Sequence, residues 1–269
     1  MTVPTSPSRE ADALATRHRL GALEHTFRPE SEVSVGEKHR IWFILGSLAG
    51  IAALVGGGVL LWVEVSWTIA MYPLWIGLLA AGVVARSPFF RRGLAGKRLY
   101  LYEHGLVVNT TGRALFAVRW ERAVLYQETV QEVIAYKGRQ TPVGRSHASV
   151  LVAPGGRKAR ITDFYAGAQT WAPLIAEAVA RAQTEKVWKL VRDGGTVGFG
   201  PFAVSAAAVT HTSHGALPWS EVGEVAVRGG AVYVWRAGQS KAWGHCQAPK
   251  VPNLLVFLTI VDAIRRGQA

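Results

Sequence analysis

The most continuous hydrophobic stretch of the chain runs from Ile41 to Ala85 and carries a single formal charge, at Glu64. As one helix rising ~1.5 Å per residue it would be about 68 Å long, roughly twice the ~30 Å hydrocarbon core of a bilayer. The pattern therefore predicts two transmembrane helices, at residues 41–63 and 66–85. A charge in mid-bilayer is costly, so we expect the hairpin to turn at Glu64.

Basic residues flank both predicted spans, whereas the connection between the spans has none. The positive-inside rule then puts both termini in the cytoplasm of a multi-pass cell-membrane protein. The polar first 40 residues do not suggest a secretory signal peptide. The one cysteine, Cys246, cannot form an intramolecular disulfide, in keeping with a reducing compartment. The juxtamembrane basic residues after the second span are Arg86, Arg91, Arg92, Lys97 and Arg98.

Small residues recur along one face of the first span, at Gly46, Gly50, Ala53 and Gly57. Such spacing lets two helix backbones approach closely. This stripe of small residues is compatible with two alternatives, packing within the hairpin and homodimerisation.

After residue 98 the pattern changes to short alternating or apolar runs separated by turn residues, which predict β-strands. A helical period follows at residues 166–183. The same order recurs: strands at 196–235, then a last helix that opens at Pro252 and stops before Gly267. Trp120 and Trp219 occupy matching places, which indicates an internal repeat of strands followed by one helix.

Four parts result from this pattern: a polar tail (1–36), a helical hairpin (37–92), a first domain (93–184) and a second domain (185–269). The segment GALEHTF, from residue 21, could add a strand to the first domain or remain outside it.

Several segments together resemble a group of uncharacterised actinobacterial membrane proteins, over residues 98–267 and the preceding hairpin. They are YLYEHGLVV, VRW, ITDFY, GPFAVS, LPWSEV and VPNLLVFL. The resemblance implies cytoplasmic pleckstrin-homology-like (PH-like) modules and supplies no catalytic residue. The expected fold class is therefore α+β: a transmembrane helical hairpin followed by two PH-like small β-barrels or curled sheets, each closed by a C-terminal helix.

The formal charge of +12 suggests an acidic partner. One run of basic residues has no acid within it: Lys137, Arg139, Arg145, Arg157, Lys158 and Arg160. The resemblance implies that loops of this kind contact anionic lipid headgroups. Nonspecific attraction to an anionic leaflet, or an ordinary solvated face, would explain the same charges.

Other chemistries lack a signal. There is no helix-turn-helix or zinc-finger pattern, so we expect no nucleic-acid partner. The histidines at 211, 214 and 245 lack zinc-ligand spacing, and the glycines at 194–200 are not followed by the residues of a phosphate loop. No set of side chains suggests a catalytic site, so we expect no enzyme, no cofactor and no metal.

The sequence thus predicts a membrane-anchored, non-enzymatic recognition or scaffold protein that holds a partner protein or an anionic headgroup at the cytoplasmic face. The alternative is a membrane-associated enzyme or nucleic-acid-binding protein without a recognisable motif.

Overall fold

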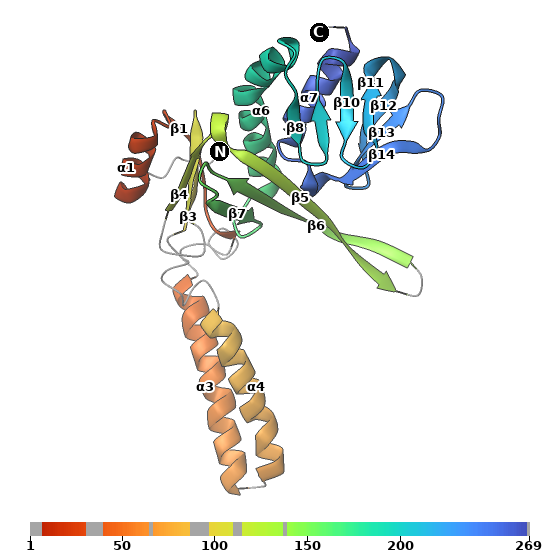
Figure 1. Cartoon of the computed structure of the whole chain (residues 1–269). Helices are drawn as coiled ribbons and strands as arrows, with labels where there is room; N and C mark the ends of the chain where they lie inside the picture. The colour runs from red at the N-terminus through yellow and green to blue at the C-terminus, as the bar shows by residue number, and fades with distance from the viewer. Residues whose placement is uncertain are drawn as a thin grey trace. The chain divides into compact units, whose positions relative to one another are not determined.

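The computed structural model describes residues 7–30, 40–64, 67–86, 97–109, 115–136 and 139–267. The chain forms two compact units (Figure 1). One unit combines residues 1–27 with residues 99–269, and the other is the intervening segment, residues 28–98. The smaller unit is therefore inserted into the larger one.

The inserted unit contains two helices, α3 (Arg40–Glu64) and α4 (Trp67–Arg86). They approach closely at two glycines. A Cβ added at Gly58 would lie 2.8 Å from Leu74 Cγ, and one at Gly77 would lie 3.1 Å from Val55 Cγ2. A Cβ at Gly46, Gly50 or Gly57 would meet nothing within 4 Å, so the three glycines of the stripe singled out in the sequence do not make the close contact between α3 and α4. Described side chains such as Trp42, Leu60 and Leu79 are more than half exposed.

The predicted membrane spans at 41–63 and 66–85 are wrong. In the described parts of the chain, no helix has both the length and the apolar character needed to cross a membrane. Hydropathy counts apolar side chains without regard to what they contact, and here some of them pack between α3 and α4. The two-span membrane partner and the multi-pass localisation are corrected with the spans. The predicted homodimer and the predicted contacts with lipid headgroups both assumed these membrane spans, so that premise no longer supports them.

The larger unit begins with a helix and a four-stranded antiparallel sheet. Helix α1 (Arg9–His18) starts at Ser8, whose hydroxyl accepts a hydrogen bond from the Ala11 N–H. The sheet has the order β1-β2-β3-β4. Its strands are β1 (Leu23–Phe27), β2 (Leu99–Tyr102), β3 (Gly105–Asn109) and β4 (Leu115–Arg119). The segment GALEHTF thus supplies an edge strand.

A three-stranded antiparallel sheet and a long helix follow. The strands are β5 (Val124–Tyr136), β6 (Arg139–Val152) and β7 (Lys158–Thr162), and the helix is α6 (Ala168–Arg192). Among the described residues, β7 pairs with Ala148–Val152 of β6 and with no other segment, so the outer part of the β5–β6 hairpin is a two-stranded ribbon that projects from the sheet (Figure 1). Helix α6 confirms the helix predicted at 166–183 and extends it to Arg192.

The same order occurs a second time. A four-stranded sheet contains β8 (Val197–Phe199), β9 (Phe202–Val204), β10 (Ala208–His211) and β11 (Gly215–Pro218). A three-stranded sheet contains β12 (Val222–Arg228), β13 (Ala231–Arg236) and β14 (Ala242–Gln247). Helix α7 (Leu254–Arg265) ends the repeat. Pro252 precedes this helix by two residues instead of opening it, because Asn253 is the N-cap.

In each repeat a tryptophan marks the break between the two sheets. Trp120 begins the 3-10 helix η1 (Trp120–Arg122), and Trp219 begins η2 (Trp219–Glu221). The indole Nε1 of Trp120 donates to the Tyr102 carbonyl at 3.0 Å, and that of Trp219 donates to the Ser205 carbonyl at 2.9 Å. Each indole therefore ties the chain that leaves one sheet to the backbone of the sheet before it.

The predicted PH-like barrels are also wrong. A barrel closes only when every strand is hydrogen-bonded to the next. In the described residues no ladder joins β4 to β5 or β11 to β12, and the strands form four separate small sheets. Alternating hydrophobicity predicts strands but does not show where a ladder stops. The α+β content itself is present.

Both repeats share one apolar core, to which α6 contributes Trp171 and Ile175 and α7 contributes Phe257 and Ile260. A second cluster lies between α1 and the first sheet and includes Ala11, Tyr100 and Tyr102. Strand β2 is buried on both faces as a result.

Candidate binding cleft

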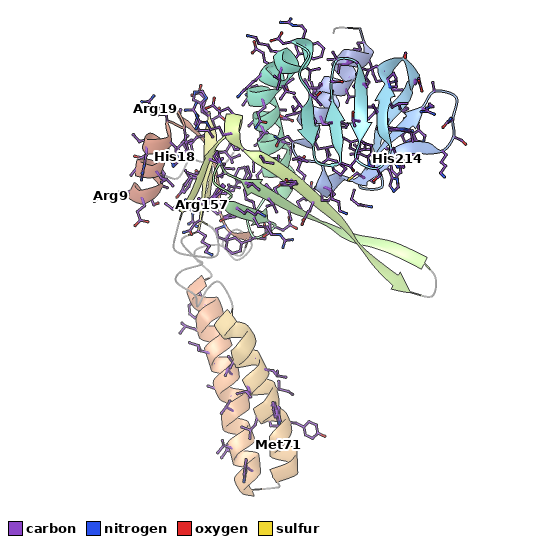
Figure 2. All side chains as sticks on the ribbon, viewed as in Figure 1. Arg9, His18, Arg19, Met71, Arg157 and His214 are labelled. Atoms are coloured by element: carbon purple, nitrogen blue, oxygen red, sulfur yellow. The ribbon has the colours of Figure 1, made fainter. Side chains whose placement is uncertain are left out.

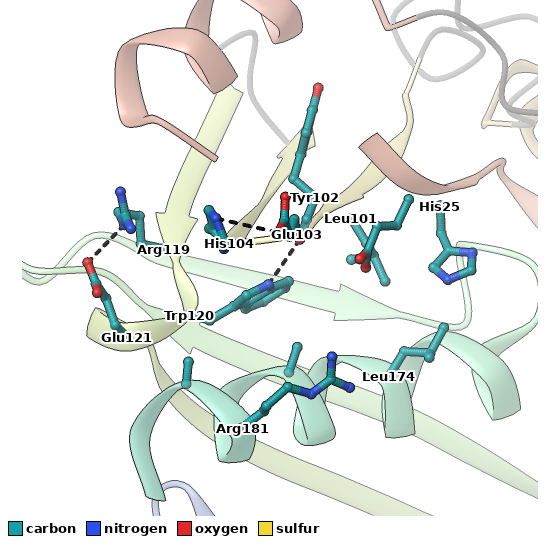
Figure 3. Close-up of a pocket in the computed structure, with 13 residues that line it drawn as sticks. His25, Leu101, Tyr102, Glu103, His104, Arg119, Trp120, Glu121, Leu174 and Arg181 are labelled. Carbon is teal, nitrogen blue, oxygen red and sulfur yellow. Dashed lines mark hydrogen bonds and ion pairs between the residues drawn. The ribbon is translucent and has the colours of Figure 1, made fainter. Parts of the chain in front are cut away.

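The first sheet and helix α6 line a cleft of about 260 Å³, which we call the charged cleft (Figure 3). Its lining comes from four places that are distant in sequence: β1, the β2–β3 turn, the β4–η1 junction and the outer face of α6. The lining residues are Glu24, His25, Leu101, Tyr102, Glu103, His104, Arg119, Trp120, Glu121, Leu174, Ala178, Arg181 and Ala182.

A β-bulge in β1 turns two of these side chains toward the cleft. The strand partners are Leu23 with Tyr102 and His25 with Leu101, so Glu24 is the extra residue. In a regular strand, Leu23 and Phe27 would face the same side. Instead Leu23 packs beneath α1 and Phe27 joins the main core, because the bulge reverses the alternation. The His25 ring lies 6.2 Å from that of Phe27, on the core side.

The floor of the cleft is apolar and rigid. The Trp120 side chain is buried and held by its hydrogen bond to the Tyr102 carbonyl. Leu174 and Ala178 of α6 line the same space. The Tyr102 side chain points away from the indole, toward α1 (Figure 3). Burial, with Asp12 and Tyr100 nearby, raises the pKa of the Tyr102 phenol to about 12, so it stays protonated.

The rim of the cleft carries charges of both signs. Arg119 Nε lies 2.8 Å from Glu121 Oε1, and Arg119 Nη1 donates to the Arg19 carbonyl at 3.2 Å. His104 Nε2 lies 3.7 Å from Glu103 Oε1. Within the part of the chain that the structure describes, Glu24 and Arg181 have no ion-pair partner. The Glu24 carboxylate and the Arg181 guanidinium can therefore each pair with a group of opposite charge on a ligand.

The six basic residues proposed for anionic headgroups do not form one cluster. Lys137 lies outside the described residues. Arg157 Nη2 donates to the Leu115 carbonyl at 3.1 Å, and its guanidinium lies 6.0 Å from the centre of the Phe116 ring. Arg160 pairs with Glu128 at 3.2 Å. Lys158 is opposite Val152 in the ladder, thirteen residues along β6 from Arg139, which is about 44 Å of extended strand. Arg145 lies between them on β6.

The basic residues that follow α4 differ among themselves. Arg86 ends the helix, and Arg91 and Arg92 lie outside the described residues. Lys97 is 6% exposed, and burial lowers the pKa of its ammonium. Arg98 Nη1 donates to the Lys97 carbonyl. Lys97 is therefore not an open surface cation.

The histidines singled out in the sequence lie together in the second repeat. The rings of His211 and His214 stack at 4.9 Å, and Trp243 is next to both. Among the described residues, no three His, Cys, Asp or Glu side chains are placed to hold a metal ion.

Sequence reasoning did not find Glu24, His25 and Arg181 as members of one site. The bulge at Glu24 depends on the register between β1 and β2, which are separated by the whole inserted unit. The signal available in the sequence was the segment LEHTF, where three polar residues in a row interrupt the alternation expected of a half-buried strand.

One family model matches residues 5–269, almost the whole chain, and its description is "Family of unknown function (DUF6585)". No curated protein and no solved structure matches the chain.

Proposed function

The chain belongs to the DUF6585 family, whose function is unknown, and we propose from its own geometry that it is a non-enzymatic recognition protein. It would hold a partner protein by a charged segment that lies in the charged cleft. This proposal rests on one observation: the open charges of Glu24 and Arg181 at the rim of a rigid apolar floor.

The chemistry of the cleft suits binding. Trp120 is fixed by packing and by its indole hydrogen bond, so a ligand would not have to order it. The charges are at the rim, where they select a partner and its orientation more than they add affinity. A segment with a basic residue for Glu24, an acidic residue for Arg181 and an apolar side chain between them would complement the cleft.

Selection of peptides from a random display library on the full chain tests this proposal. We expect the enriched peptides to carry both charges around an apolar residue. Arg181→Glu and Glu24→Lys should each weaken binding of the selected peptides about fivefold or more, because each reversal replaces an exposed ion pair of up to about 1 kcal/mol with a repulsion of similar size. The loss should shrink in 1 M salt, where the screening length is about 3 Å.

Matched controls lie on α6 outside the cleft lining. Glu177→Lys and Lys186→Glu change the same charges at exposed helix positions, and they should leave peptide affinity unchanged. Selected peptides that bind all four variants equally would refute recognition by the charged cleft.

A further inference from the structure

A second cavity lies between the base of the β5–β6 hairpin and the start of α6, and its volume is about 400 Å³. We call it the polar cavity. Its lining residues are Gln127, Glu128, His147, Ala148, Ser149, Gln169, Ala172 and Pro173. None of them belongs to the charged cleft.

The polar cavity begins where the apolar face of the sheet ends. Leu125 and Leu151 are paired across β5 and β6 and are buried in the core. Two residues further along each strand, on the same face, Gln127 is paired with Ser149. The core-facing side of β5 and β6 thus becomes polar at Gln127 and Ser149, where the first turns of α6 still line the space beside the strands.

Four polar side chains that line the polar cavity make no hydrogen bond to a described residue. Ser149 is 2% exposed, yet its hydroxyl makes no hydrogen bond to any described residue, and neither do the side-chain amides of Gln127 and Gln169. The His147 backbone N–H donates to the Asp163 carboxylate at 3.0 Å, and the His147 imidazole makes no hydrogen bond to a described residue. The Ser149 hydroxyl oxygen is not among the fully buried side-chain atoms that lack a partner, so it is accessible from the polar cavity, where a ligand can bond to it.

The available groups define the chemistry of that ligand. Hydroxyl, amide and imidazole groups each offer both a donor and an acceptor, as the hydroxyls of a sugar do. The one carboxylate among the described lining residues, Glu128, is already paired with Arg160. A charged ligand would lose hydration without finding an opposite charge. Pro173 and Ala172 supply an apolar wall for the C–H face of a ring.

We propose that the polar cavity binds an uncharged sugar residue, held by Gln127, Ser149 and Gln169. A cavity of this size lies within the range of small-molecule sites. For a ligand of about twelve heavy atoms, usual ligand efficiencies correspond to a dissociation constant on the order of 1 mM.

The full chain would be titrated with glucose, galactose, mannose and N-acetylglucosamine, followed by saturation-transfer NMR. Glucuronate, glycerol and N-acetylglycinamide serve as charged, acyclic and amide probes. We expect at least one neutral sugar to bind at least tenfold more tightly than all three of these probes. Equal binding of glycerol or the amide, or no sugar binding below about 100 mM, would overturn the proposal.

Variants distinguish a ligand contact from a structural role. Ser149→Ala should reduce sugar affinity at least about fivefold, the contribution of one hydrogen bond, while leaving the melting temperature unchanged, because the hydroxyl makes no hydrogen bond to a described residue. Gln169→Ala, at an exposed helix position, should reduce sugar affinity at least about fivefold without affecting folding. Gln247→Ala, an exposed glutamine of β14, is the matched control and should bind as the natural chain does. Unchanged sugar affinity in both Ser149→Ala and Gln169→Ala would exclude the polar cavity as the site.

Discussion

His211 is a buried, titratable residue whose environment disfavours its charged form. Burial lowers the pKa of its imidazole below the ordinary 6.5, and His214 lowers it further, while a hydrogen bond with the His245 backbone opposes the shift. Its Nδ1 accepts a hydrogen bond from the Ser213 N–H at 3.2 Å. Aromatic contacts with Phe202 and Trp243 complete its surroundings.

A lowered pKa in the folded state means that the unfolded chain binds a proton more readily. The contribution of His211 to stability is therefore fully present above pH 6.5 and is lost as the pH falls from there through the pKa of folded His211. His211→Asn keeps an acceptor for the Ser213 N–H and removes the titration, so its unfolding free energy should depend less on pH between 7.5 and 5.5. Urea unfolding at a series of pH values measures this dependence. His18→Asn, at an exposed position of α1, should keep the pH dependence of the natural chain.

Asn253 connects the two repeats at the level of secondary-structure elements. Its backbone N–H donates to the Leu125 carbonyl at 2.8 Å, and its Oδ1 accepts from the Leu125 N–H at 2.7 Å. Its Nδ2 donates to Gln183 Oε1 at 2.8 Å. Gln183 in turn donates to the carbonyls of Trp120 and Ala123. The start of α7, the edge of β5, helix α6 and η1 thus meet in one hydrogen-bond network.

Asn253 also has a left-handed backbone, with φ of 50°. Asparagine tolerates this conformation better than most residues, and glycine adopts it freely. Asn253→Ala should lose about 2–3 kcal/mol of unfolding free energy, because it adds backbone strain to the lost hydrogen bonds. Asn253→Gly should lose less, about 1–2 kcal/mol, because it removes only the side-chain bonds. Denaturant unfolding gives both values.

A double-mutant cycle between Asn253→Ala and Gln183→Ala should show a coupling of about 1 kcal/mol, as expected for residues of one network. Gln239→Ala, an exposed glutamine in a turn, should change stability by less than about 0.5 kcal/mol. Strict additivity of the Asn253 and Gln183 changes would contradict the network.

The larger unit as a whole is interrupted by an insertion in a β-hairpin. Strands β1 and β2 are antiparallel neighbours, and Phe27 is paired with Leu99 at the end where the inserted unit begins. The core of the larger unit consists of its own residues on both sides of the insertion. The inserted unit therefore occupies the place of a hairpin turn.

Replacing residues 28–98 by Asn-Gly should yield a folded larger unit, because this dipeptide suits a two-residue hairpin turn between paired strands. Shortening the connection also reduces the loop-closure entropy of β1 with β2. We expect cooperative denaturant unfolding and a far-ultraviolet circular dichroism spectrum of mixed helix and strand. An aggregated or unfolded product would show that the inserted unit is needed for folding.

The local elements of this chain were largely predictable, because they depend on neighbouring residues. Alternation predicts the strands around Leu106 and Val209, helical spacing predicts α6, and Gly267 ends the last helix as expected. The membrane spans were wrong, since hydropathy does not specify what an apolar side chain contacts. The sequence showed that Trp120 belongs to an internal repeat. It did not show that one sheet ends and another begins at this residue.

The sequence alone determined the strand and helix periodicity, the repeat marked by Trp120 and Trp219 and the excess of positive charge, because each is a property of residue order or composition. Only the tertiary structure decided the rest. It joined β1 to β2 across the inserted unit, introduced the bulge that turns Glu24 and His25 into the charged cleft, and placed Arg181 opposite them. It also placed the Ser149 hydroxyl, which has no hydrogen-bond partner among the described residues, at the wall of the polar cavity. These features depend on strand register and on contacts between distant segments, which local hydrophobic patterns do not encode.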